Sequence, residues 1–152
     1  MNALIQTDPI RQGRCLCGAV RFAAHGQPHE IDACHCSMCR RQTGGGPYYA
    51  AQFKGGITFE ADETLRWYKG SDTGERGFCT VCGSTIAWRM QAIPDMIGVS
   101  LGTLDDTNGL ALEAHIFTDS APDYYPLPTD APHKTGEQVI SEFMQRLQEI
   151  AP

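Results

Sequence analysis

The sequence predicts a mostly β protein with zinc knuckles and a C-terminal helix. Three observations lead to this fold class. Short segments of alternating apolar residues are separated by glycine and acidic turns, the cysteines lie in closely spaced groups, and apolar residues near the C-terminus recur at helical spacing. A chain of 152 residues is most simply one domain, long enough to form a core without disulfides.

The strands are predicted in chain order from their apolar alternation. The first follows a glycine-flanked turn and ends near residue 23, and a short strand over residues 30–33 leads to Cys34. The glycine-rich residues 42–47 exclude a regular helix and predict a loop whose backbone can approach a ligand closely. Further strands are predicted over residues 48–53, 57–59, 65–68, 84–89, 96–101 and 112–117.

The C-terminal region changes from strands to a helix. Residues 121–133 contain four prolines and predict an extended surface segment. From Gly136 onward, apolar residues at helical spacing predict an amphipathic helix that packs on the domain. These apolar residues are Val139, Ile140, Phe143, Met144, Leu147 and Ile150. The predicted organisation is an N-terminal extension (1–12), a zinc-binding domain (13–135) and the C-terminal helix (136–152).

Charge and the chain start argue against several functions. The formal net charge is -6, whereas general binders of nucleic acid or anionic membranes carry a basic face. Residues 1–12 lack the basic start and apolar run of a signal peptide, and no segment has the length of a membrane span. We therefore expect a cytoplasmic protein that binds neither nucleic acid nor membranes. An anionic substrate would need local arginines.

Seven cysteines carry the main chemical signal. They form a pair, a trio and a second pair, each with the spacing of metal-ligand knuckles. The groups are Cys15 and Cys17; Cys34, Cys36 and Cys39; and Cys79 and Cys82. Four thiolates make a closed tetrahedral zinc site and three leave a position open, so four plus three is the partition most consistent with seven. The two pairs would then form a structural site that clamps distant segments, and the trio an open, catalytic site.

Two arginines and a glycine run follow the trio. Alternate residues of a strand point to opposite faces, so Cys34 and Cys36 can share one metal only if the chain turns near His35. A guanidinium offers two parallel hydrogen bonds, which makes Arg40 the candidate for holding a substrate carboxylate. Gly44 opens the glycine run and is the candidate for close contact between backbone and substrate.

These motifs resemble the glutathione-dependent formaldehyde-activating enzymes, a family that shares its domain with centromere protein V. The resemblance covers about residues 13–120 and rests on the three cysteine motifs in this order, with support from residues 101–106 and 115–117. The chain departs from the family at residues 121–125, where many members have a Pro-Trp pair, and in its glycine-rich loop 44–46.

The resemblance implies a fold, a metal arrangement and an activity. The implied fold is a tent-like arrangement of antiparallel sheets. The implied ligands are Cys15, Cys17, Cys79 and Cys82 for a structural zinc ion, and Cys34, Cys36 and Cys39 for a catalytic one. The implied activity is that of a carbon-sulfur lyase, which adds glutathione or a similar small thiol to formaldehyde or another aldehyde, or removes it. Zinc suits this reaction because a thiol bound at an open position is deprotonated at neutral pH.

Other hypotheses fit parts of the pattern. The trio could belong to a non-catalytic module for protein or thiol binding if His35 or His115 supplied a fourth ligand. A zinc-ribbon nucleic-acid binder conflicts with the acidic charge, and a disulfide framework conflicts with the spacing and a reducing compartment. A dithiol redox protein would need a cysteine pair that follows a strand and opens a helix, and the sequence predicts neither pair in that place. The oligomeric state and the particular thiol and aldehyde stay open.

Overall fold

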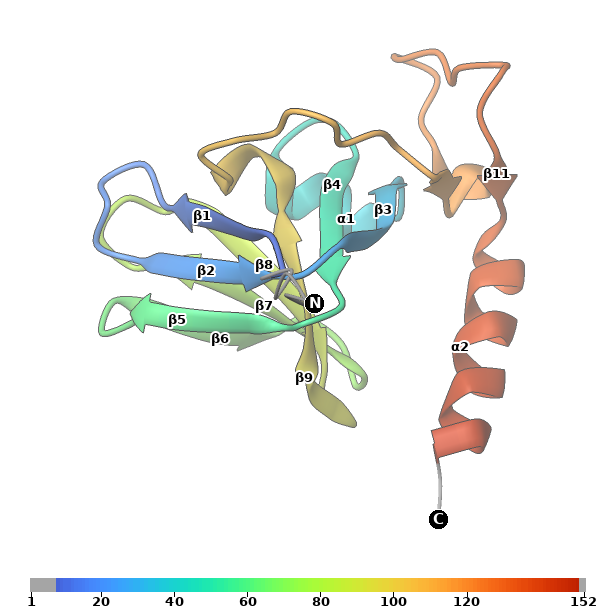
Figure 1. Cartoon of the computed structure of the whole chain (residues 1–152). Coiled ribbons are helices and arrows are strands. Elements are labelled where there is room, and N and C mark those ends of the chain that lie inside the picture. Colours follow the sequence, from blue (N-terminus) through green and yellow to red (C-terminus); the bar gives the residue numbers. More distant parts are fainter. Residues whose placement is uncertain (1–7, 151–152) are drawn as a thin grey trace. The chain divides into compact units, whose positions relative to one another are not determined.

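The computed structural model describes residues 8–150, which fold into two compact units (Figure 1). The first unit contains residues 8–29 and 50–110, and the second contains residues 30–49 and 111–150. The mostly β fold with a C-terminal helix is confirmed. Within the described residues, no helix is both long and apolar enough to cross a membrane.

A small antiparallel sheet in the first unit is formed by β1 (Ile10–Arg14), β2 (Arg21–His25) and β5 (Ile57–Ala61). Gly13 of β1 lies opposite Phe22 of β2, and a Cβ atom at Gly13 would collide with the Phe22 ring. That ring is fully buried and meets Phe59 edge to face at 6.1 Å between centroids. Gly13 therefore gives the core room for Phe22 beside the first cysteine pair.

A larger antiparallel arrangement completes the first unit. Ala50 and Ala51 pair with β9 (Ile93–Ser100), which pairs in turn with β8 (Thr85–Met90). β7 (Gly74–Cys79) joins β8 to β6 (Leu65–Lys69), and the short helix η1 (Leu101–Thr103) follows β9. Strand β7 was not predicted from the sequence, because glycines and a buried arginine interrupt its alternation.

The second unit contains a parallel set of strands. β10 (Ala114–Ile116) pairs in parallel with both β3 (Pro28–Cys34) and β11 (His133–Lys134). Parallel pairing was not predicted, since the implied sheets were antiparallel. It is possible here because long connections join these strands, and the second one includes the short helix η2 (Thr118–Ser120). The remaining strand, β4 (Tyr48–Phe53), runs from the second unit into the first.

Helix α1 (Ser37–Thr43) begins directly after the first two cysteines of the trio. Cys36 is its N-cap and accepts a hydrogen bond from the backbone N–H of Cys39, while Gly44 ends it with φ of 83°. The prediction that neither cysteine pair follows a strand and opens a helix is therefore wrong for Cys36 and Cys39. The helix has only seven residues, which is too short to give a periodic sequence pattern, and it extends to Thr43 inside the predicted loop.

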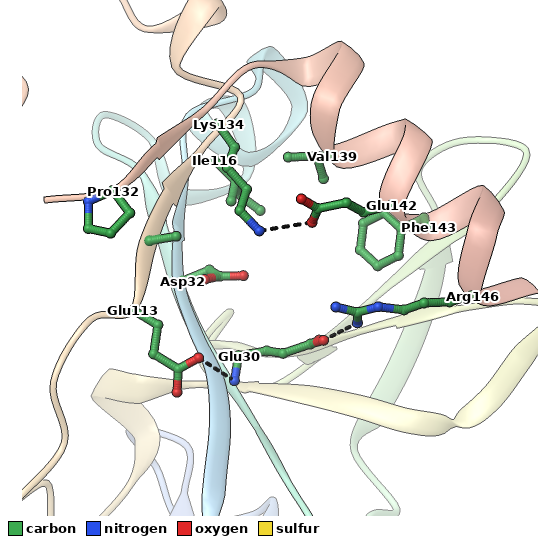
Figure 2. A pocket seen from close by; sticks show the side chains of 11 residues that line it. Glu30, Asp32, Glu113, Ile116, Pro132, Lys134, Val139, Glu142, Phe143 and Arg146 are labelled. Atoms are coloured by element: carbon green, nitrogen blue, oxygen red, sulfur yellow. Dashed lines mark hydrogen bonds and ion pairs between the residues drawn. The ribbon is translucent and has the colours of Figure 1, made fainter.

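Helix α2 (Gly136–Ile150) begins at the predicted residue and is fastened to the strands of the second unit. Lys134 of β11 pairs with Glu142 at 2.8 Å, and Arg146 pairs with Glu30 of β3 (Figure 2). These pairs border a cavity of about 200 Å³ that also contains Asp32 of β3. Burial, followed by the charges of Glu30 and Glu113, raises the pKa of Asp32 to about 6.

The predicted division at residues 12 and 135 stays a prediction. Residues 1–7 of the expected N-terminal extension and residues 151–152 of the expected helix lie outside the described part of the chain. Strand β1 already begins at Ile10.

Candidate metal centre

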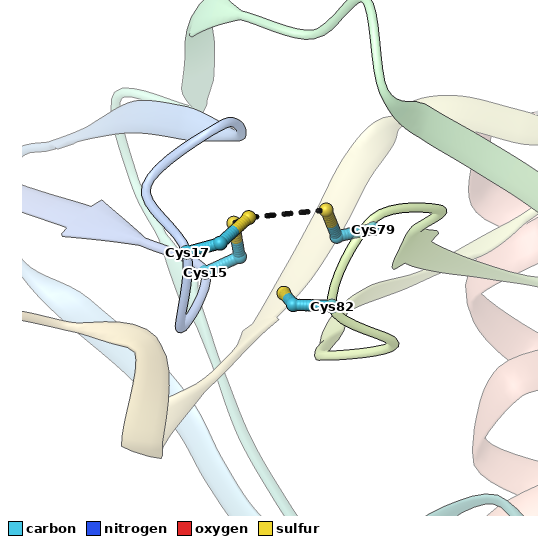
Figure 3. Close-up of side chains that lie close together, drawn as sticks. All are labelled: Cys15, Cys17, Cys79 and Cys82. Carbon is cyan, nitrogen blue, oxygen red and sulfur yellow. Dashed lines mark hydrogen bonds between the residues drawn. The ribbon is translucent and has the colours of Figure 1, made fainter.

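Four cysteine side chains from two loops of the first unit form a cluster. One pair lies in the turn between β1 and β2, and the other lies at the end of β7 and in the turn before β8 (Figure 3). Their sulfur atoms all lie within 4.8 Å of one another. The four residues are Cys15, Cys17, Cys79 and Cys82. The structure thus brings together the two pairs that the sequence assigned to one site.

The loops around this four-thiol cluster are shaped by glycine and bridged by serine. Gly18 and Gly83 have φ of 79° and 74°, which is the left-handed backbone that a tight knuckle requires. The Ser84 hydroxyl accepts from the Leu16 N–H at 3.0 Å and lies 3.1 Å from the Cys82 sulfur, to which it can donate. Hydrogen bonds from the Ser84 hydroxyl, from the Ser84 backbone and from Cys17 together lower the pKa of Cys82 to about 5. Ser84 therefore links the two knuckles and favours the thiolate form of one ligand.

The remaining three thiols meet where β3 gives way to α1. The sulfur atoms of Cys34, Cys36 and Cys39 also lie within 4.8 Å of one another. Cys36 and Cys39 are buried, and Cys34 is half-buried. The turn predicted near His35 is present, because the strand ends at Cys34 and the helix starts two residues after His35.

Hydrogen bonding within the trio separates the acidities of its thiols. Hydrogen bonds with Cys34 and Cys39 lower the pKa of Cys36, while hydrogen bonds with Cys36 and Cys39 raise that of Cys34. Three thiols this close cannot all lose their protons without a compensating positive charge. A bound cation would remove the conflict.

Both clusters fit zinc by the chemistry of their donors. Zinc binds thiolate sulfur and is usually four-coordinate, so four thiols suffice for a closed site and three leave one position open. Within the described residues, no fourth histidine, cysteine or carboxylate joins the trio. The three thiols therefore match an open site, and the four match a closed one.

His35 and His115 hydrogen-bond each other instead of joining the trio. His35 Nε2 lies 2.9 Å from His115 Nδ1, and His35 Nδ1 lies 2.8 Å from the Tyr125 hydroxyl. Burial lowers the pKa of both histidines, that of His35 to about 4 with a further contribution from His115 and His133. Both ring nitrogens of His35 are thus engaged, which gives no support to a fourth ligand from this residue.

Arg40 lies on α1 and is half-buried. Its Nε donates to the His35 carbonyl at 3.4 Å, and within the described residues no carboxylate forms an ion pair with it. Gly44 donates its N–H to the Arg40 carbonyl at 2.9 Å as the helix ends. A Cβ atom at Gly44 would meet nothing within 4 Å, so the positive φ explains this glycine, and its contact with substrate stays a prediction.

The sequence did not indicate that two tyrosines contact the residues on either side of α1. The Tyr125 hydroxyl meets His35, and the Tyr124 hydroxyl donates to the Gly45 carbonyl. The signal available in the sequence was that residues 121–125 differ from the Pro-Trp pattern of the family.

The fold and the two clusters define a mostly β protein with two sites suited to zinc. The chain belongs to the glutathione-dependent formaldehyde-activating enzyme family, because the profile of that family matches residues 10–120. This confirms the resemblance drawn from the cysteine motifs.

Two curated proteins and one solved structure are similar to this chain at identities between 24% and 29%. The chain is 24% identical to an uncharacterised lyase of Schizosaccharomyces pombe, covering 91% of this chain and 98% of the relative. It is 29% identical to a Halomonas elongata protein that is provisionally named a glutathione-dependent formaldehyde-activating enzyme. The match covers 76% of this chain and 79% of the relative. A crystal structure of a Rhodobacter sphaeroides protein superposes with a TM-score of 0.52 at 26% identity, covering 64% of this chain and 91% of that one.

Proposed function

We propose that this protein is a zinc-dependent carbon-sulfur lyase that adds a glutathione-like thiol to an aldehyde carbon, or removes it, as in S-hydroxymethylglutathione formation. The observation that carries the proposal is the trio of thiols with no fourth ligand among the described residues. The names of the S. pombe and H. elongata relatives, a lyase and a formaldehyde-activating enzyme, support the same reaction class.

Cys34, Cys36 and Cys39 would hold the catalytic zinc ion. Zinc bound by three thiolates supplies an open position at which a substrate thiol has a lowered pKa and a fixed orientation. The chain contributes the orientation of its ligands: Cys34 ends a paired strand, and Cys36 caps a helix. Holding the thiol and the aldehyde in one site would make their reaction effectively unimolecular and lower its entropic barrier.

Arg40 would bind a carboxylate of the thiol substrate. The net charge of -6 repels anions at long range, so a carboxylate needs a local positive group. Arg40 follows Cys39 directly, and no acidic side chain within the described residues occupies its guanidinium. The backbone at Gly44 is exposed at the end of the same helix and could contact the rest of the substrate.

Cys15, Cys17, Cys79 and Cys82 would hold a structural zinc ion. These residues connect the turn after β1 with the turn after β7, and a metal bound to both contributes directly to folding. In this proposal, residues 13–135 form the zinc-binding domain and α2 packs on it. We place the reaction in the cytoplasm, where reducing conditions keep the seven thiols free for metal.

The proposal is tested by zinc content and by catalysis in the same samples. Zinc per chain is measured for the native protein and for Cys36→Ser, and the exchange of formaldehyde with S-hydroxymethylglutathione is followed by magnetisation-transfer NMR. We expect two zinc ions to fall to one, with the fold retained by circular dichroism and the catalysed exchange lost. Cys82→Ser is the matched control, and it should lose the other zinc ion together with the fold.

Two outcomes would contradict the proposal. If the native protein binds two zinc ions but does not accelerate the exchange, the result would favour a non-catalytic zinc-binding module. One zinc ion in both the native protein and Cys36→Ser would reject the partition of the thiols.

A further inference from the structure

The segment after η2 brings two tyrosine hydroxyls to the two ends of α1. The Tyr125 hydroxyl lies 2.8 Å from Nδ1 of His35, which precedes the helix. The Tyr124 hydroxyl donates to the carbonyl of Gly45, which follows the helix. These contacts hold Tyr124 and Tyr125 beside the element that carries Cys39.

Tyr125 shares its surroundings with the trio and with the proposed carboxylate-binding arginine. Burial is the main cause that raises the pKa of Tyr125. Electrostatic interactions with Tyr124, Tyr49 and Cys34 raise it further, and the interaction with Arg40 lowers it, for a net rise. The hydroxyl therefore keeps its proton at neutral pH and can act as a donor. Tyr125 is half-buried, which leaves part of its ring accessible to a substrate.

A buried pair of histidines can fix the direction in which this hydroxyl donates. His35 and His115 are 1% and 4% exposed, and their facing nitrogens are 2.9 Å apart. A neutral imidazole has one donor and one acceptor nitrogen. When His115 Nδ1–H donates to His35 Nε2, His35 Nδ1–H donates to the Tyr125 oxygen. The hydrogen of the Tyr125 hydroxyl is then available to a group other than His35.

We infer that Tyr125 is a catalytic residue whose hydroxyl gives a hydrogen bond, and then its proton, to the aldehyde oxygen of the substrate. The inference rests on the proposed lyase function. His35 and His115 are positioning residues that aim the hydroxyl. When the His35 Nδ1–H donates to it, the Tyr125 oxygen is held in place and the hydroxyl hydrogen stays available to the substrate.

The proton and electron count of the step balances. The substrate thiol loses its proton to water and attacks the carbonyl carbon as a thiolate, so the carbon-sulfur bond forms. The π electron pair of the carbonyl moves to oxygen, which takes the proton from Tyr125, and water returns a proton to the tyrosine oxygen. Thiol and aldehyde thus give a hemithioacetal, which for formaldehyde is the S-hydroxymethyl thioether, with no net change in protons. The cleavage direction reverses each step.

Tyr125→Phe is compared with Tyr124→Phe in the zinc-loaded full-length protein. Exchange between ¹³C-formaldehyde and S-hydroxymethylglutathione is measured at increasing glutathione, together with zinc per chain. For Tyr125→Phe we expect the saturated exchange rate to fall about 100-fold, while the half-saturating glutathione concentration changes less than about threefold. Zinc content should not change. Tyr124→Phe keeps the saturated rate within about threefold of the native value, because its hydroxyl bonds to backbone and not to His35.

The outcomes separate this inference from the function on which it rests. Equal rates in the two variants, with native exchange intact, overturn the role of Tyr125 and leave the proposed function standing. A Tyr125→Phe protein that loses zinc, or that loses only affinity for glutathione, also overturns it, because the effect would then lie in metal or thiol binding. A native protein without catalysed exchange rejects the proposed function and the role of Tyr125 together.

Discussion

The two thiol clusters share their ligand chemistry and differ in what surrounds it. In the first unit, four thiols join two glycine-shaped turns, and Ser84 bridges the turns by hydrogen bonds. In the second unit, three thiols lie between a strand and a helix, and the neighbouring His35 is bonded to His115 and Tyr125. The first cluster therefore matches a closed zinc site, whereas the second matches a site with one ligand position open.

The arginine beside each cluster also differs in its surroundings: within the described residues, one forms an ion pair and the other does not. Arg14, which precedes the first cysteine, forms an ion pair with Asp105 at 3.5 Å. Arg40, which follows the last cysteine of the trio, pairs with no acidic side chain in the described part of the chain. A paired arginine stabilises a fold modestly, and an unpaired one beside an open site can bind an anion. The residues beside the two clusters therefore differ in the way that the two proposed roles require.

Replacing a ligand in each cluster should give the largest contrast. Cys79 is completely buried, and Cys79→Ser should lower the free energy of unfolding by about 4 kcal/mol or more, because the cross-link through zinc is lost. Cys36→Ser should cost much less stability. Urea denaturation with zinc analysis measures both, and equal destabilisation by the two variants would show that the trio is also structural.

Chelation should remove the two metals at different rates. An open coordination position lets a chelator attack directly, so we expect the trio to release zinc about 100-fold faster than the four-thiol cluster under EDTA. Metal release is followed with a colorimetric indicator, and the fold by circular dichroism. Release of the first zinc ion should coincide with loss of activity, and release of the second should coincide with unfolding. Simultaneous release would contradict the distinction between open and closed sites.

Removing the unpaired arginine should affect substrate binding more than removing the paired one. Arg40→Gln should raise the KM for glutathione about tenfold with kcat changed less than about threefold, since a charged hydrogen bond to a carboxylate is lost. Arg14→Gln is the matched control and should leave both constants nearly unchanged. Steady-state kinetics at fixed formaldehyde measures these values, and equal effects would remove Arg40 from the substrate site.

Protonation of Asp32 should make the stability of the second unit depend on pH. The pKa of Asp32 is about 6 in the fold against an ordinary value of 3.8, so the folded state holds this proton more tightly. Its contribution to stability is complete below pH 3.8 and is lost as pH rises through about 6.

Asp32→Asn tests this smallest effect. The variant should be more stable than the native protein by about 1 kcal/mol at pH 8, after allowance for solvent screening, and gain little at pH 4. Asp95→Asn, at an exposed position of the first unit, should not show this pH dependence. Urea denaturation at both pH values measures the difference, and a gain independent of pH would assign the effect to packing rather than charge.

The sequence predicted the elements whose signals are local. Closely spaced cysteines identified both clusters, and the apolar spacing after Gly136 identified α2. Strand β7 was missed because Gly74 and Gly77 interrupt its alternation and Arg76 is buried in it. Helix α1 was missed because its seven residues give too little periodicity.

Most contacts between distant segments could not be read from the sequence. The assignment of the two cysteine pairs to one site is the exception, because the number of thiols needed for a closed site gave a signal. The bond between His35 and Tyr125 joins residues 90 positions apart, and the bond between His35 and His115 spans 80 positions. The parallel pairing of β10 with β3 likewise depends on the path of the chain between them. Such contacts are set by tertiary structure and have no periodic signature in either segment.

The interleaved order of the two units has a consequence during synthesis. The trio lies within six consecutive residues, so all three of its thiols are present once Cys39 has left the ribosome. Its partners in the fold, His115 and Tyr125, are made only after both pairs of the four-thiol cluster are complete. The site proposed for catalysis therefore has all of its thiols before the four-thiol cluster does, yet it is completed last. A chain cut short after residue 110 would hold every thiol and lack Tyr125.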